Sequence, residues 1–144
     1  MNRDAFRRGL KRLEEYIDRL DEIATLDQAR FLSDFMVHAA AERFLQLAIE
    51  SILDLGNQII AARELSEPTS YREIPLVLGR AGILPTDFAE SLVPMVKFRN
   101  VLVHDYADLD LNLVHEIVVN RRQNLRQCLG YLSRYYAHDT TQPS

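Results

Sequence analysis

Apolar residues recur at alternating spacings of three and four along much of this chain, and this pattern constrains its fold more than any other feature. Near the start, the set is Phe6, Leu10, Leu13, Ile17, Leu20 and Ala24. Charged residues occupy the opposite side, which predicts a one-sided amphipathic helix of about six turns. Near the end, similar spacings connect Val114, Ile117, Leu125, Cys128, Leu132 and Tyr135, with one gap at Arg121. They predict a second long helix with one buried face.

The stretch 27–65 is more apolar, and its hydrophobic residues nearly encircle the predicted helix, with a bend expected near Ser33 and Asp34. A helix of this kind is normally central in a bundle. A polar stripe interrupts it at spacings of seven, four and three, made of Arg43, Glu50, Asp54 and Asn57. Two interpretations stay open for this stripe: a solvent-facing edge, or a polar seam that faces Arg99 or a partner chain.

Local signals divide the rest of the chain into helices. Residues 25–28 and 70–73 have the pattern of capping boxes, with Thr25 and Ser70 as the expected N-caps. The second box opens a short helix that ends by Gly79. The next helix has Thr86 as its expected N-cap and contains Pro94, where we expect a kink, and residues 108–110 cap the last helix.

The predicted fold is therefore an all-α antiparallel bundle of four main helices plus one short helix. A length of 144 residues suits one domain, which we place at 1–137, followed by a flexible tail at 138–144. Cys128 is the only cysteine, and no run of 18 apolar residues or apolar signal core is present. We expect a soluble cytoplasmic protein without an internal disulfide or a membrane segment.

The net charge of −4 counts against broad, non-specific coating of nucleic acid, but it allows a small basic site. The candidate cations are Arg80, Lys97, Arg121, Arg122 and Arg126. An equally simple interpretation is that they form a solvated helix face. Neither a Cys/His set for zinc nor a Gly-rich phosphate loop is evident in the sequence, so we expect no cofactor and no metal.

Strong polar chemistry enters the apolar helical pattern in one place, Arg99-Asn100-Val101-Leu102-Val103-His104-Asp105-Tyr106. Asn100 comes one helical turn before His104 and pairs with it. Arg99 and His104 are five residues apart, or roughly 140° around a regular helix. A straight helix would not direct both at one atom. Either the helix loosens near His104, or a second chain completes the site across a two-fold axis.

These residue types suit metal-free cleavage of RNA. An imidazole can take the proton of a ribose 2′-hydroxyl, because its pKa lies near the working pH. A guanidinium such as that of Arg99 can hold the non-bridging phosphate oxygens, and Asn100 can fix the imidazole of His104. The structural alternative stays open as well, because Arg and His near a helix C-terminus often only satisfy its last carbonyl groups.

The stretch 99–106 closely resembles the signature of HEPN-domain ribonucleases, in which an Arg and a polar residue precede a His. More narrowly, an Arg, four residues, a His, one residue and a Tyr resemble the HepT toxin family of HepT–MntA toxin–antitoxin systems. The segments 43–50 and 53–60 are similar to the long second helix of that family, and 71–84 is similar to its short linking helix. The resemblance covers roughly residues 1–137.

The resemblance implies a type VII toxin that acts as a metal-independent endoribonuclease, with Arg99 and His104 as the catalytic pair and Asn100 in support. It implies that Tyr106 is the residue to which a cognate MntA-type nucleotidyltransferase adds AMP. It also implies a homodimer in which two motifs meet in a cleft that takes the RNA substrate. Two other functions stay open: a non-catalytic helical dimer that docks a nucleotidyltransferase, or a related fold that senses a nucleotide.

Overall fold

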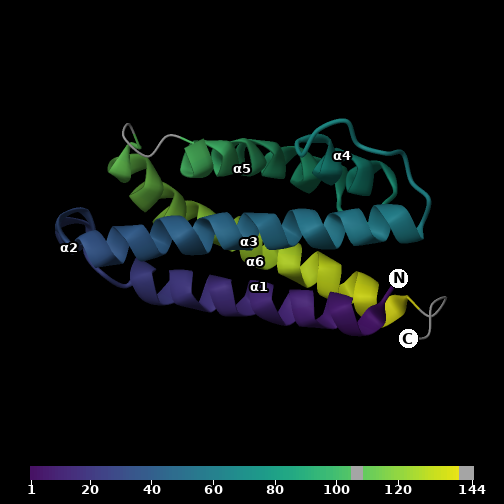
Figure 1. Cartoon of the computed structure of the whole chain (residues 1–144), viewed down its shortest axis with the longest axis horizontal. Helices are drawn as coiled ribbons and strands as arrows, with labels where there is room; N and C mark the ends of the chain where they lie inside the picture. Colours follow the sequence, from purple (N-terminus) through teal and green to yellow (C-terminus); the bar gives the residue numbers. More distant parts are fainter. Residues whose placement is uncertain (105–108, 140–144) are drawn as a thin grey trace.

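The computed structural model describes residues 1–104 and 109–139, and this part of the chain is folded into helices joined by turns and loops. The helices are α1 (Arg3–Ala24), α2 (Gln28–Ser33), α3 (Phe35–Ala62), α4 (Glu73–Arg80), α5 (Thr86–His104) and α6 (Leu111–His138). Successive long helices run in opposite directions (Figure 1). The predicted all-α bundle is confirmed, with α1, α3, α5 and α6 as the main helices and α2 as a short helix beyond the one expected.

Helix α3 is the centre of the bundle, as its apolar circumference predicts. It contacts each of the other five helices. It lies between α1 and α5, with α6 crossing behind (Figure 1). Its side chains Leu45, Ala48, Ile49 and Ile59 are almost wholly buried. Because α3 contacts both α1 and α5, a polar side chain of α3 can contact one or the other of these helices, depending on the face of α3 that carries it.

The bend expected near Ser33 and Asp34 is a complete break between α2 and α3. The Asp34 side chain accepts hydrogen bonds from the backbone N–H groups of Met36 and Val37, at 3.0 and 3.4 Å, and so caps α3. The capping box predicted at Thr25 is wrong. Asp27 caps α2 instead, accepting from the Arg30 N–H at 2.7 Å, whereas the Thr25 hydroxyl donates to the Glu22 carbonyl at the end of α1.

The segment before α4 also differs from the expected capping box. Ser70 does not cap this helix, because α4 begins after Arg72 without a side-chain cap. The Glu73 carboxylate instead accepts from the Thr69 backbone N–H at 2.7 Å and the Thr69 hydroxyl at 3.0 Å. The bond from the Thr69 backbone, followed by that from its hydroxyl, lowers the pKa of Glu73. These bonds fasten the loop that carries Tyr71.

Helix α4 packs closely on α3 and α5. This packing fixes the position of the loop that precedes α4. A Cβ atom added to Gly56 of α3 would lie only 2.7 Å from the Ile74 side chain. A Cβ atom added to Gly79 of α4 would lie 2.8 Å from the Cβ atom of Ala89 in α5. Both glycines therefore allow a close approach between helices that a side chain would prevent.

The two ends of the described chain meet at one end of the bundle (Figure 1). Arg3 donates to the Asp139 carbonyl at 2.9 Å. His138, which was predicted to begin the tail, is the last residue of α6, and residues 140–144 lie outside the described part. No helix within the described part is both long and apolar enough to cross a membrane.

Candidate active site

Helix α5 carries three of the four predicted site residues in its last two turns: Arg99, Asn100 and His104. The helix is continuous from Thr86 to His104, so it shows no loosening up to that residue. The fourth predicted residue, Tyr106, belongs to 105–108 and lies outside the described residues.

The Arg99 guanidinium is held by an ion pair that joins α5 to α3. Its Nε and Nη2 atoms donate to Oε2 of Glu50 at 3.1 and 3.0 Å. The two side chains are only 20% and 31% exposed, so water screens the pair less than it would on an open surface. The same Glu50 oxygen accepts from Nε2 of Gln46 at 3.3 Å, one turn earlier on α3. The polar-seam interpretation of the stripe is therefore confirmed at Glu50.

Two further contacts fix the plane of the Arg99 guanidinium. Its Nη1 atom donates to Oδ1 of Asn100 at 3.3 Å. Its Cζ atom lies 5.2 Å from the centre of the Tyr71 ring, within the range of a cation–π contact. A guanidinium has five N–H donors, and three of them are used by described residues. Two donors are left that can bind phosphate oxygens.

His104 is exposed at the C-terminal end of α5. No hydrogen bond joins it to Arg99 among the residues that the structure describes. Because five residues of a regular helix turn through about 500°, the two side chains leave α5 in directions roughly 140° apart. Asn100 is four residues before His104 and lies on the same helix face. Asn100 is thus the residue that both bonds Arg99 and lies on the same side of α5 as His104.

The other three residues of the polar stripe on α3 lie in three different environments. Asn57 lines a pocket together with Asn100 and Tyr71. Asp54 lies with Glu50 along a groove against α1. Arg43 is exposed. The stripe therefore faces Arg99 at Glu50, whereas Arg43, Asp54 and Asn57 are exposed, as the solvent-facing interpretation expects.

Tyr71 is the residue of this region to which sequence reasoning gave no role. It lies 28 residues before Arg99, and its spacing gives no sign of a contact. The only signal was that the loop between α3 and α4 carries an aromatic residue, where polar residues are more usual. The residue is 51% exposed, so Tyr71 is not part of the hydrophobic core.

Two of the candidate cations have a structural role. Arg122 donates to Asp21 at 2.7 Å, and Arg126 donates to Asp18 and Asp21 at 2.9 and 2.7 Å. Burial raises the pKa of Asp21, but the hydrogen bonds from Arg122 and Arg126 outweigh it, and the pKa of Asp21 falls below its usual value. Both arginines therefore form ion pairs that join α6 to α1, and they are no longer candidates for binding RNA.

The other reactive groups offer little chemistry. Cys128 is completely buried, and burial raises the pKa of its thiol to about 12, which leaves it neutral and unreactive. The described residues hold no group of three or more His, Cys, Asp or Glu side chains that could bind a metal ion. Among the remaining candidate cations, Lys97 is exposed on α5 and lines the same pocket as Asn100.

An all-helical bundle with a held Arg, a neighbouring Asn and an exposed His at one helix end is what the resemblance to HEPN-domain ribonucleases implies. A family model described as "Ribonuclease HepT-like" matches residues 13–132. The chain therefore belongs to the HepT-like ribonuclease family. The resemblance stated from the sequence is confirmed, and with it the classification of the chain among ribonucleases.

Named relatives agree with this family. The chain is 29% identical over 106 residues to the mRNA nuclease HepT of Shewanella oneidensis, covering 74% of this chain and 80% of that protein. It is 30% identical over 105 residues to the tRNA nuclease HepT of Aphanizomenon flos-aquae, covering 73% of this chain and 71% of that protein.

A solved structure of the tri-AMPylated HEPN toxin of Shewanella oneidensis, in complex with its MNT antitoxin, superposes with a TM-score of 0.83. The match covers 93% of this chain and 99% of that toxin at 25% identity. The fold of this chain is therefore the fold of a HEPN toxin that was solved in complex with an MNT antitoxin.

Proposed function

We propose that this chain is the endoribonuclease toxin of a toxin–antitoxin system, and that it cleaves RNA without a metal ion. The observation that carries the proposal is the fixed guanidinium of Arg99, held by Glu50 and Asn100 with two N–H donors left for a phosphate. Exposed His104 lies one turn beyond Asn100 and supplies an imidazole that can accept and donate a proton. The nuclease names of the two relatives support the same chemistry.

The reaction would proceed by attack from within the RNA. His104 accepts the proton of a ribose 2′-hydroxyl, and the freed oxygen attacks the neighbouring phosphorus atom. The bond from phosphorus to the 5′-oxygen breaks, which leaves a 2′,3′-cyclic phosphate. The departing 5′-oxygen takes a proton from a second imidazole or from water. Arg99 stabilises the negative charge that grows on the non-bridging oxygens.

The geometry of α5 favours a site shared between two copies of the chain. Arg99 and His104 lie on one continuous helix and face directions roughly 140° apart. In a two-fold dimer whose interface contains the end of α5, the same helix of the second copy faces the first, so each Arg99 can meet the other copy's histidine. This arrangement brings two guanidinium groups and two imidazoles into one cleft.

Modification of Tyr106 would silence the enzyme. Tyr106 is two residues beyond His104, and the related toxin was solved in an AMPylated state with its antitoxin. Each AMP attached to a tyrosine oxygen adds bulk and about one negative charge. That charge can pair with Arg99 and repel the phosphates of an RNA strand. The partner would be an MntA-type nucleotidyltransferase.

The nuclease is tested with purified protein, a mixture of cellular RNA and excess EDTA. We expect cleavage that leaves a 2′,3′-cyclic phosphate, and a loss of at least about 100-fold in rate for Arg99→Ala and for His104→Ala. Arg8→Ala and His138→Ala are matched controls, because Arg8 is an exposed Arg of α1 and His138 ends α6 as His104 ends α5.

Two results would overturn this assignment. Cleavage by the Arg99→Ala and His104→Ala variants at the rate of the parent would remove both residues from the mechanism. No cleavage of any RNA by the unmodified parent would leave the non-catalytic docking module or the nucleotide sensor as the function.

The proposed switch is tested by intact mass after co-expression with an MntA-type nucleotidyltransferase. We expect one or more added AMP groups on the parent and none on Tyr106→Phe, with cleavage lost only in the modified protein. An AMP increment that persists in Tyr106→Phe would place the modification elsewhere.

A further inference from the structure

An open pocket of about 680 Å³ lies between the loop before α4 and the surfaces of α3 and α5, and two of its lining residues, Asn100 and Tyr71, contact Arg99. Its size is within the range of roughly 300–1,000 Å³ that is typical of small-molecule sites. Asn100 forms part of its wall, so the pocket adjoins the catalytic residues. Its other polar and aromatic walls come from Asn57, Glu67, Thr69, Ser70, Tyr71, Arg72 and Lys97.

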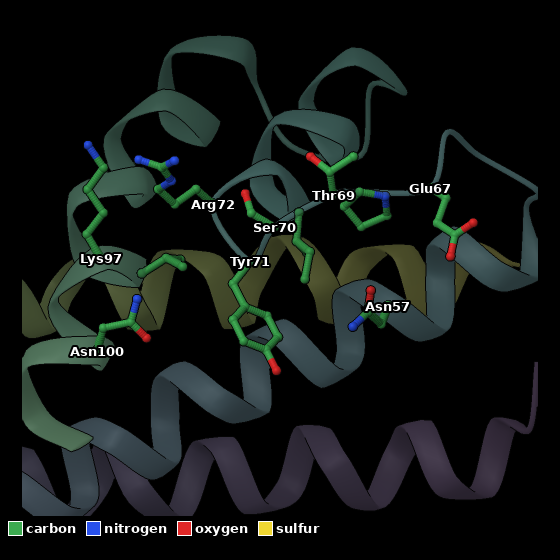
Figure 2. Close-up of a pocket in the computed structure, with 11 residues that line it drawn as sticks. Asn57, Glu67, Thr69, Ser70, Tyr71, Arg72, Lys97 and Asn100 are labelled. Atoms are coloured by element: carbon green, nitrogen blue, oxygen red, sulfur yellow. The ribbon is translucent and has the colours of Figure 1, made fainter. Parts of the chain in front are cut away.

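Tyr71 lines this pocket, and its ring lies between Asn100 and Asn57 in the view of Figure 2. Half of its surface is exposed, at 51%. The Arg99 guanidinium lies against it, 5.2 Å from the ring centre. The loop that carries it is fastened by the bonds from Thr69 to Glu73. An aromatic platform is therefore held open to solvent, in direct contact with the residue that binds the scissile phosphate.

Positive charge is concentrated at one end of the pocket. Lys97 and Arg72 carry their charged groups toward the same side of it, whereas Glu67 lies at the other end (Figure 2). Both cations are exposed, and no ion pair occupies either of them among the described residues. The chain is acidic as a whole, with a net charge of −4. This end of the pocket is therefore locally basic in an acidic protein, and it suits the binding of a phosphate.

These features together match the way proteins bind single-stranded nucleic acid. Bases stack on exposed aromatic rings, and cations follow the phosphates on either side. The side-chain amides of Asn57 and Asn100 flank the ring and can bond the edges of a base. A tyrosine that only packed on Arg99 would need neither the surrounding amides nor the two unpaired cations.

We infer that this pocket binds one nucleotide of a single-stranded RNA, next to the phosphate at which Arg99 acts. The base stacks on Tyr71, and Lys97 and Arg72 bind the adjoining phosphates. The inference rests on the proposed nuclease function and adds to it a subsite for substrate. It explains how an acidic protein holds RNA: the grip is local and depends on stacking.

The test measures binding apart from cleavage. A labelled single-stranded RNA with 2′-O-methyl groups throughout cannot be cut, because it lacks the attacking hydroxyl. We expect fluorescence anisotropy to show a dissociation constant about ten-fold higher for Tyr71→Ala and for Tyr71→Leu, and within two-fold of the parent for Tyr71→Phe. Leucine restores apolar packing without a stacking surface, so rescue by Tyr71→Leu would reduce Tyr71 to a packing role and overturn the inference.

The cations are tested with the same oligonucleotide at several salt concentrations. Lys97→Ala and Arg72→Ala should each weaken binding and reduce the slope of log binding constant against log salt by about 0.7. Lys11→Ala, an exposed cation on α1, is the control and should change neither quantity. If both pocket variants show the same slope as the parent, Lys97 and Arg72 do not contact phosphate, and that part of the inference is wrong.

The subsite and the nuclease can fail separately. If the parent cleaves natural RNA and Tyr71→Ala cleaves with unchanged KM, the nuclease stands and the subsite is wrong. If the parent never cleaves but binds the methylated RNA in a Tyr71-dependent way, the subsite stands and the nuclease is wrong. Competition by free AMP as strong as by the oligonucleotide would assign the pocket to a mononucleotide and overturn the RNA subsite.

Discussion

The ion pair between Arg99 and Glu50 makes a prediction that a double-mutant cycle can measure. Hydrogen bonds to charged groups contribute about 1.5–3 kcal/mol when they are well shielded. Fully exposed ion pairs contribute only about 0.2–1 kcal/mol. Because the Arg99 and Glu50 side chains are 20% and 31% exposed, and the pair contains two hydrogen bonds, we expect a coupling free energy of about 1–1.5 kcal/mol.

The assay is urea unfolding of the parent, Arg99→Ala, Glu50→Ala and the double variant, followed by far-UV circular dichroism. The cycle cancels the contacts that only one partner makes, such as the bond from Gln46 to Glu50 and the ring contact of Arg99 with Tyr71. Glu50→Gln should keep the fold but lower kcat, because it weakens the hold on the guanidinium. A coupling below about 0.3 kcal/mol would refute the claim that Glu50 positions Arg99.

Two further predictions concern the bundle itself. Gly79→Ala should lower the free energy of unfolding by about 1–3 kcal/mol, because its Cβ atom would lie 2.8 Å from the Cβ atom of Ala89. The control Gly130→Ala has open space around the added Cβ atom, and it should raise the free energy of unfolding by about 0.5–1 kcal/mol. Equal effects of the two substitutions in urea unfolding would contradict the packing of α4 on α5. Burial raises the pKa of the Cys128 thiol to about 12, against an ordinary value of 9.0. The resulting contribution to the stability of the folded state is fully present below pH 9 and is lost as pH rises. Between about pH 9 and pH 12, the parent should therefore lose about 1.4 kcal/mol per pH unit relative to Cys128→Ala, and a constant difference between the two would show that the thiol is not buried.

The helices and their order could be predicted from the sequence because hydrophobic periodicity is a local signal. The buried face of α6 and the central place of α3 followed directly from spacing. The caps were less predictable, because several acceptors compete at each helix start. At α2, Asp27 is a better acceptor than Thr25 for the first N–H groups, and the break at Asp34 separated a helix that periodicity alone would have continued.

The place of the candidate site residues near the end of a long helix could also be predicted, but their partners could be predicted only as alternatives or not at all. The bond from Arg99 to Glu50 spans 49 residues, and the contact with Tyr71 depends on how α4 folds back over α3 and α5. Such contacts follow from the packing of helices, which no local pattern encodes. The same reason explains why Arg122 could only be a candidate cation in the sequence, because its pairing with Asp21 depends on how α1 packs against α6.

The central claim is that Arg99 of one copy and His104 of the other act on the same phosphate. Mixing Arg99→Ala and His104→Ala subunits tests it, because a mixed dimer holds one intact pair only if the pair is shared between chains. We predict that co-expressed, co-purified mixed dimers recover up to about half of the parental cleavage rate, since one of two equivalent sites is restored. Cleavage no faster than that of either variant alone would show that the two residues do not act across the dimer.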